Sequence, residues 1–349
     1  MNSLPEINLN YLNSKLIDLL NIPSPTGFTE EVFNYLENSL KGYQGLKINR
    51  TAKGGLTAAW DCGRPEGMRG LTAHLDTLGA MVKEIKANGR LRLSRIGGYA
   101  WNTIEGEGCW VRTRQGELIP GSILVTKASA HIHSKKVSET ERSEKTMEVR
   151  MDIPVSSESD SRNAGVEVGD FVFLTPRVEE HNGFIRSRHL DDKAGVACIL
   201  AGIQALMENG MEPALDTVFH FSNYEEVGHG AASGFPAGMK ELVAVDMAAV
   251  GEGQTSDEYH ATLCVKDSGG PYHFGLNERL KKLAEKYQIP HRVDIYPHYG
   301  SDGEAYWRAG GDVEVALIGP GVDASHNYER THQKALAATT KWIMAYLIN

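Results

Sequence analysis

Histidines and acidic residues occur at five places where short apolar runs end or loops begin. These places are His74-Leu75-Asp76, Asp191-Asp192, Glu225-Glu226, Asp246 and Ser325-His326. Two imidazoles with several carboxylates make a ligand mix that suits zinc, cobalt or manganese. Packed together without cations, the carboxylates would repel one another, and some would have to be protonated. Two divalent ions about 3.5–4 Å apart would neutralise them and activate a bridging water, so the residue types indicate metal-dependent hydrolysis.

Each of these places also has an ordinary structural explanation. A lone histidine is more often structural than a ligand, and acidic pairs usually lie on solvated surface. Asp191-Asp192 can cap the N-terminus of the helix that follows. Their joint occurrence at the ends of expected strands favours a metal site over these structural explanations.

The elements that must position these residues alternate between short apolar strands and helices. Strands are expected at 56–60, 70–74, 216–221, 242–246 and 313–318, and helices at 29–41, 194–206, 278–287 and 333–347. This alternation predicts an α/β fold with a mostly parallel sheet sandwiched by helices. Because the carboxyl ends of such strands form one crevice, residues far apart in sequence can meet there.

Between about Gly79 and Pro176 the pattern changes. Hairpin signals such as Asn88-Gly89 recur between short alternating runs, and helical periodicity is missing. The polar stretch 134–145 is expected to be a mobile surface loop. We therefore predict an α/β domain formed by 1–78 plus 179–349, with a small β-rich, barrel-like domain, 79–178, inserted into it.

The composition excludes several classes of protein. The 349 residues include 36 Lys and Arg against 45 Asp and Glu, a formal net charge of −9. Such a chain is poorly suited to gripping nucleic acid or an anionic membrane surface. No apolar run reaches the roughly 18 residues of a membrane span, and no secretory signal is recognisable. We expect a soluble cytoplasmic protein.

Five motifs occur in an order that resembles a known family. They are Ser24-Pro25-Thr26-Gly27, Ala73-His74-Leu75-Asp76-Thr77-Leu78-Gly79, Leu190-Asp191-Asp192-Lys193-Ala194-Gly195, Glu225-Glu226-Val227-Gly228 and Ser325-His326. Together they resemble the glutamyl or tetrahedral aminopeptidases, the co-catalytic zinc metallopeptidases of family 42 in clan MH. The resemblance spans nearly the whole chain. It implies a zinc-exopeptidase-like fold and a dinuclear aminopeptidase that removes N-terminal residues from short peptides.

The resemblance also implies a ligand set for two divalent ions per subunit, zinc first, with cobalt or manganese as alternatives. His74 and Asp246 match ligands of one ion, and Glu226 and His326 match ligands of the other. Asp191 matches the carboxylate that bridges the two.

Three further residues receive roles from the same resemblance. Glu225 matches the general base. It takes a proton from the metal-bridging water, which leaves a hydroxide as the nucleophile, and passes that proton to the leaving amine. Asp76 matches the residue that orients the ring of His74. Asp302, within a segment similar to the family's Gly-Thr-Asp, is expected to line the substrate site, and Asp192 is expected to be structural.

The resemblance further implies that 1–78 plus 179–349 form the catalytic metallopeptidase domain and that 79–178 is a dimerisation or assembly domain, through which a homododecamer forms. Within that domain His131 and His133 alternate on an expected strand, which would allow a third metal site, although surface polarity explains them as well. No role is assigned to His332.

Three alternative functions remain open. A metal-dependent carboxypeptidase or deacylase of the same fold would recognise a carboxylate through an arginine such as Arg292 or Arg330. A metal-independent glycoside hydrolase would use Glu225 and Glu226 as its carboxylate pair, and leaves the histidines unexplained. A metal-stabilised scaffold would bind ions without turnover and would not need a base.

Overall fold

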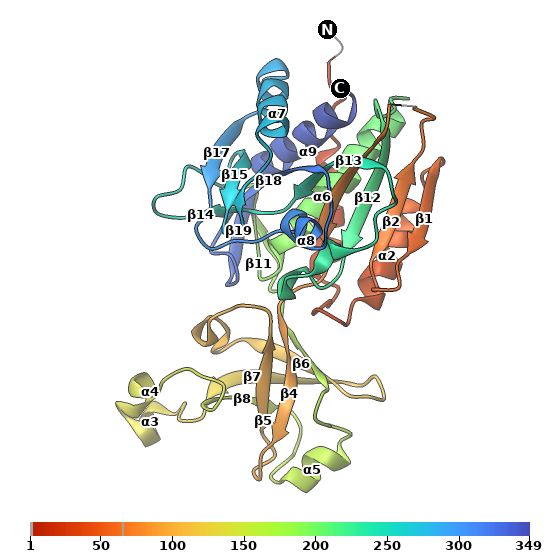
Figure 1. Cartoon of the computed structure of the whole chain (residues 1–349). Helices are drawn as coiled ribbons and strands as arrows, with labels where there is room; N and C mark the ends of the chain where they lie inside the picture. Colours follow the sequence, from red (N-terminus) through yellow and green to blue (C-terminus); the bar gives the residue numbers. More distant parts are fainter. Residues whose placement is uncertain (1–2, 65) are drawn as a thin grey trace. The chain divides into compact units, whose positions relative to one another are not determined.

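A computed structural model describes residues 3–64 and 66–349 and divides the chain into two compact units. The first unit comprises Met1–Asp76 and Arg177–Asn349, and the second comprises Thr77–Pro176 (Figure 1). The predicted fold class is confirmed, because the first unit contains a large α/β sheet and the second a closed barrel. An assembly role for the second unit stays a prediction.

The first unit is built on a 13-stranded sheet whose main path runs β1-β2-β12-β3-β13-β18-β19-β11-β10. Along this path the strands are β1 (Leu46–Arg50), β2 (Leu56–Trp60), β12 (Asp216–Ser222), β3 (Met68–His74), β13 (Met239–Val245), β18 (Glu314–Asp323), β19 (Glu329–His332), β11 (Phe184–Ser187) and β10 (Glu179–His181). Four strands branch from it: β14 (Ala248–Val250), β15 (Ala261–Asp267), β16 (Gly270–Pro271) and β17 (His291–Ile295). The central strands β12, β3, β13 and β18 are parallel, and the strands that flank them on the main path pair antiparallel.

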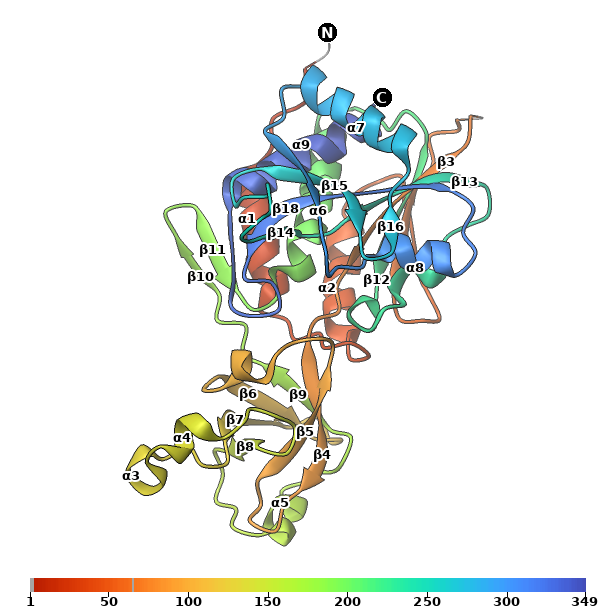
Figure 2. The same ribbon diagram turned by 60° about the vertical axis from the view of Figure 1, so that its left-hand side comes forward.

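Within the described residues of this unit, six helices accompany the sheet. They are α1 (Leu9–Leu20), α2 (Glu30–Leu40), α6 (Leu190–Glu208), α7 (Phe274–Lys286), α8 (Asp302–Arg308) and α9 (Gln333–Leu347). Helix α6 packs between α1 and α9, as Figure 2 shows, and its apolar residues from Val196 to Leu206 are almost wholly buried. Burying each such Val, Leu or Ile side chain contributes about 1.5–3 kcal/mol to folding.

Both faces of the central sheet are covered. Val243 and Val245 of β13 belong to the core that contains α1, α6 and α9, whereas Leu242 and Ala244 belong to a second core with Tyr306 of α8. Successive side chains of a strand point to opposite faces, so these strands are apolar on both sides and read as continuous apolar runs.

The second unit is a closed antiparallel barrel with its own apolar core. The strand order is β4-β5-β8-β7-β6-β9, from β4 (Gly79–Ile85), β5 (Leu91–Ile96), β8 (Met147–Met151), β7 (Leu118–Val125), β6 (Gly108–Arg112) and β9 (Phe171–Leu174). The predicted turn at Asn88-Gly89 joins β4 to β5, and Gly89 adopts a left-handed φ of 79°. A 3₁₀ turn, η1 (Trp101–Ile104), and helix α5 (Glu158–Asn163) complete the unit with the helices named next.

The polar stretch 134–145 is not wholly a loop, contrary to the prediction. It contains helix α4 (Lys136–Glu139), which follows helix α3 (Ala130–His133), and Arg142 holds Glu105 through two hydrogen bonds of 2.6 and 2.9 Å. His131 and His133 therefore lie on a short helix, where residues two apart do not face one another. Neither belongs to a group of described residues that could hold a metal ion.

Candidate metal centre

The expected ligands gather where the central strands of the large sheet end. His74 is the last residue of β3, and Asp246 directly follows β13. Glu226 lies in the 3₁₀ turn η2 (Glu225–Val227) after β12, and His326 lies in the connection from β18 to β19. Asp191 comes from the opening of α6, where its φ of −75° and ψ of 109° are not helical.

These five side chains form two groups that share one residue. His74, Asp191 and Asp246 place ligand atoms within 4.8 Å of one another, and we call them the His74 group. Asp191, Glu226 and His326 do the same, and we call them the His326 group. The His74 group is buried throughout, whereas the side chain of His326 is 34% exposed.

Asp191 presents a different oxygen to each group. Its Oδ1 lies 2.9 Å from Nε2 of His74, and its Oδ2 lies 3.4 Å from Nε2 of His326. A carboxylate that bridges two cations needs this arrangement, with one oxygen directed to each ion.

Asp246 reaches its position because β18 offers no side chain beside it. The main-chain N–H of Asp246 donates to the carbonyl of Ile318 at 3.0 Å. A Cβ on the next residue, Gly319, would lie only 1.6 Å from the main-chain oxygen of Asp246. Glycine at this point of β18 therefore permits the close approach.

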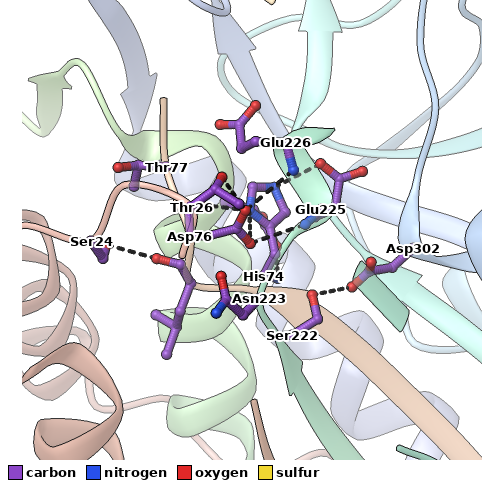
Figure 3. A network of polar contacts seen from close by, with 12 residues as sticks. Ser24, Thr26, His74, Asp76, Thr77, Ser222, Asn223, Glu225, Glu226 and Asp302 are labelled. Carbon is purple, nitrogen blue, oxygen red and sulfur yellow. Dashed lines mark hydrogen bonds and ion pairs between the residues drawn. The ribbon is translucent and has the colours of Figure 1, made fainter. Parts of the chain in front are cut away.

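The ring of His74 is oriented by Asp76, but through the main chain. Nδ1 of His74 lies 2.8 Å from the carbonyl oxygen of Asp76 and 3.8 Å from its carboxylate. The carboxylate accepts hydrogen bonds from the Thr26 hydroxyl at 2.7 Å and from the N–H groups of Glu225 and Glu226 at 3.2 and 3.3 Å (Figure 3). Asp76 thus holds both the imidazole and the turn that carries the two glutamates.

The turn η2 sends its two glutamates in different directions. Tyr224 before it and Gly228 after it both have left-handed φ values, 76° and 86°. Oε2 of Glu225 lies 3.7 Å from Nε2 of His74, whereas Oε2 of Glu226 lies 3.5 Å from Nε2 of His326. Neighbours in sequence therefore face different groups.

Two more buried carboxylates contact the main chain of the expected ligands. Asp192 accepts from the N–H of His74 at 3.3 Å and, as a helix cap, from the N–H of Gly195 at 3.1 Å. Glu329, which the sequence reasoning missed, accepts from the N–H groups of Asp191 and His326. Its position three residues after His326 was the one available signal.

Asp302 lies within a hydrogen-bond network instead of presenting a free carboxylate. It is buried at the start of α8 and accepts from the hydroxyls of Thr72 at 2.9 Å and Ser222 at 2.5 Å, and from the N–H of Ala231 at 2.8 Å. Figure 3 shows Ser222 and Asp302 beside the glutamate turn. Since both oxygens are engaged, this geometry favours a role in joining strands over the expected substrate contact.

The electrostatics of the centre favour cations. Burial, together with the charge of Asp191, raises the pKa of Asp246 to about 7 and that of Glu226 to about 8. Burial also opposes ionisation of Asp191, but hydrogen bonds from His326 and His74 hold the pKa of Asp191 below its usual range. These acids impede one another's ionisation, which positive charge among them would relieve.

The donor set fits a divalent metal. Oε1 of Glu226 is buried without a hydrogen-bond partner among the residues described, so it is available as a ligand. Imidazole nitrogens with carboxylate oxygens suit zinc, cobalt and manganese alike, so the donors do not select among them.

The fold and this donor set together define a metallohydrolase of the α/β class. The profile of the M42 glutamyl aminopeptidase family matches residues 55–342. The chain belongs to this family and is a metallo-aminopeptidase.

Proteins of similar sequence or structure match this chain over nearly its full length. The chain is 48% identical over 331 residues to "Putative aminopeptidase YhfE" of Bacillus subtilis (strain 168), covering 95% of each chain. The aminopeptidase APDkam598 of Desulfurococcus kamchatkensis has a TM-score of 0.85 at 22% identity, covering 97% of this chain and 94% of its own. The Pyrococcus horikoshii TET1 peptidase, described as assembling into a tetrahedron or a large octahedral shell, has a TM-score of 0.83 at 23% identity, covering 97% and 99%.

One further finding concerns membranes. Within the described part of the chain, none of the helices combines the length and hydrophobicity that a membrane span requires.

Proposed function

We propose that this aminopeptidase holds two divalent cations, one in the His74 group and one in the His326 group, with Asp191 between them. The observation that carries the proposal is the placement of the two Asp191 oxygens, each beside the histidine of a different group. Zinc is the first candidate, and cobalt or manganese would fit the same donors.

The protein's own residues would then perform the proton chemistry. Bound divalent ions supply charge that polarises the scissile carbonyl and makes water a nucleophile near neutral pH. Glu225 stands at the rim of the His74 group and is not needed as a ligand, so it takes the proton from the attacking water and delivers it to the leaving amine. Asp76 keeps this base in place through the N–H of Glu225.

The substrates we propose are short peptides with a free N-terminus. Their α-ammonium group needs an anionic partner, which acidic residues at the rim of the centre that hold no cation would supply. We also propose that the protein is cytoplasmic. We propose a homo-oligomer, with a dodecamer as the first expectation, because the structurally similar PhTET1-12s is described as a dodecamer and the TET1 peptidase as assembling into a tetrahedron or a large octahedral shell.

The proposal is tested with aminoacyl p-nitroanilides and N-acylated amino acids after reconstitution with Zn²⁺ or Co²⁺. We expect hydrolysis of the anilides, loss of activity on chelation, and recovery when the metal is returned. Preferential hydrolysis of N-acylated amino acids would instead support a carboxypeptidase or deacylase. Activity that survives exhaustive chelation would contradict the metal mechanism.

A further inference from the structure

Glu329 is a fully buried acid with an unusual set of partners. It is the first residue of β19, and none of its surface is exposed. Buried carboxylates are costly unless they are hydrogen bonded or paired with a cation. Its hydrogen bonds therefore indicate what the residue is for.

Both oxygens of Glu329 accept main-chain hydrogen bonds from members of the His326 group. Oε2 accepts from the N–H of Asp191 at 3.1 Å, and Oε1 accepts from the N–H of His326 at 3.0 Å. Asp191 opens α6, whereas His326 lies in the connection between β18 and β19. One side chain thus joins two segments that are separated by more than 130 residues.

Both segments need such support. Asp191 lies in non-helical backbone at the start of α6. His326 has a φ of 61°, a left-handed conformation that is strained for a residue other than glycine and persists only where its surroundings enforce it. The bonds to Glu329 fix both main chains and so set the separation of 3.4 Å between Oδ2 of Asp191 and Nε2 of His326.

Within the His74 group, His74 itself is held by residues other than Glu329. The main-chain N–H of His74 donates to Asp192, and the ring of His74 contacts the carbonyl of Asp76. Loss of the Glu329 carboxylate would therefore loosen Asp191 and His326 together, while His74 keeps its own supports.

From this geometry we infer that Glu329 is a positioning residue that fixes Asp191 and His326 at the spacing a cation in the His326 group requires. The inference rests on the proposed function, because it assumes that the His326 group binds a metal ion. Residues that orient ligands in this way typically affect metal affinity or activity by about 10–100-fold.

The test is a Co²⁺ titration of full-length metal-free protein by calorimetry, comparing wild type with Glu329→Gln. Glutamine has the same shape but turns an amide donor toward one of the two N–H groups. We expect two Co²⁺ equivalents in wild type. In E329Q the equivalent that depends on both Asp191 and His326 should weaken by about 10–100-fold, and the other should weaken less, because it shares only Asp191. The more strongly weakened equivalent should be the one lost in H326A, and turnover should recover as Co²⁺ is raised.

Two further variants complete the test. Glu258→Gln is the matched control, because Glu258 pairs with the neighbouring Arg330 and, among the described residues, no hydrogen bond joins it to an expected ligand. Its titration should equal that of wild type. Glu329→Asp keeps the charge but is shorter by one methylene group, so it should weaken the same equivalent less than E329Q does.

The outcomes separate the two claims. If either folded Glu329 variant binds both equivalents as tightly as wild type, the positioning role is overturned while the two-ion proposal stands. If turnover is lost without a change in Co²⁺ affinity and cannot be recovered with Co²⁺, the role is also overturned. If wild type itself binds fewer than two equivalents, the proposed function fails and this inference fails with it.

Discussion

The buried carboxylate of Asp302 and the buried carboxylates of the expected ligands both lie in the first unit, but their surroundings differ. Asp302 accepts three hydrogen bonds from two hydroxyls and one N–H, all neutral donors. The five expected ligands instead face one another, and Oε1 of Glu226 lacks a donor among the described residues. A buried carboxylate with enough neutral donors is satisfied without an ion, whereas carboxylates that face each other require cations or protons. Donor supply, more than burial, thus distinguishes a structural acid from a metal ligand.

Removing Asp191, the ligand that the two groups share, should have the largest effect on the metal centre. Asp191→Ala should bind neither ion and lose about 1,000-fold or more of the activity, because about 4 kcal/mol of transition-state stabilisation is lost with the metals. Metal analysis of the purified variant, with activity on an aminoacyl p-nitroanilide, checks this. Retention of both ions would show that Asp191 is no bridge.

Glu225→Gln should separate chemistry from metal binding. We expect turnover to fall by about 100- to 10,000-fold, since only the proton carrier is removed, with both ions retained. Metal content and kcat are measured on the same preparation. A variant that loses an ion would place Glu225 among the ligands instead.

His326→Ala should affect one ion. This side chain belongs to one group and is partly exposed, so one metal equivalent should be lost and activity should fall with it. Binding of two equivalents as tightly as in wild type would exclude His326 from the ligand set.

Asp302→Asn tests the other member of the comparison, the carboxylate that is satisfied by neutral donors. Asparagine keeps one acceptor oxygen and turns an amide donor toward an existing donor, so the free energy of unfolding should fall by about 3 kcal/mol while both ions stay bound. Chemical denaturation and metal analysis check this. Loss of metal at unchanged stability would mean that Asp302 serves the metal centre directly.

His220 in the Asp302 network provides the smallest test. Its Nδ1 lies 3.2 Å from the Thr72 hydroxyl, and burial lowers the pKa of His220 to about 4. An unfolded histidine has a pKa of about 6.5, so the unfolded chain takes up the proton first as the pH falls. The stability that His220 contributes above pH 6.5 is therefore lost as the pH falls toward 4. From pH 7 to pH 5 the free energy of unfolding should fall by about 2 kcal/mol from this residue.

Denaturant unfolding of wild type and His220→Gln across this pH range measures that effect. The variant should lack this part of the pH dependence, because glutamine does not titrate. Parallel curves for the two proteins would show that His220 is not held neutral by the fold.

Local pattern predicted much of the architecture. The apolar stripe Val32, Phe33, Leu36 and Leu40 is the buried side of α2, and the short apolar run at 56–60 is β2. These elements could be predicted because their own residues determine them, through helical spacing in one and short-range apolar content in the other. Helix α8 was missed since its seven residues give too little periodicity.

Within the site, residue types were informative but long-range partners were not. The sequence indicated which side chains could ligate a metal, and the structure brings those five into two adjoining groups. The sequence did not indicate that the carboxylate of Asp302 accepts hydrogen bonds from Thr72 and Ser222, since these contacts depend on how three separate segments pack. Similarly, the two N–H bonds to Glu329 form only once α6 and β19 meet.

The turn that carries Glu225 and Glu226 has an evolutionary consequence. Surface loops usually tolerate insertions and deletions. Here the two adjacent residues face different groups, and both N–H groups are held by one carboxylate, that of Asp76. Adding or removing a single residue before Glu225 would shift each glutamate into its neighbour's place, so lineages that keep the activity should vary this turn in side chains but not in length.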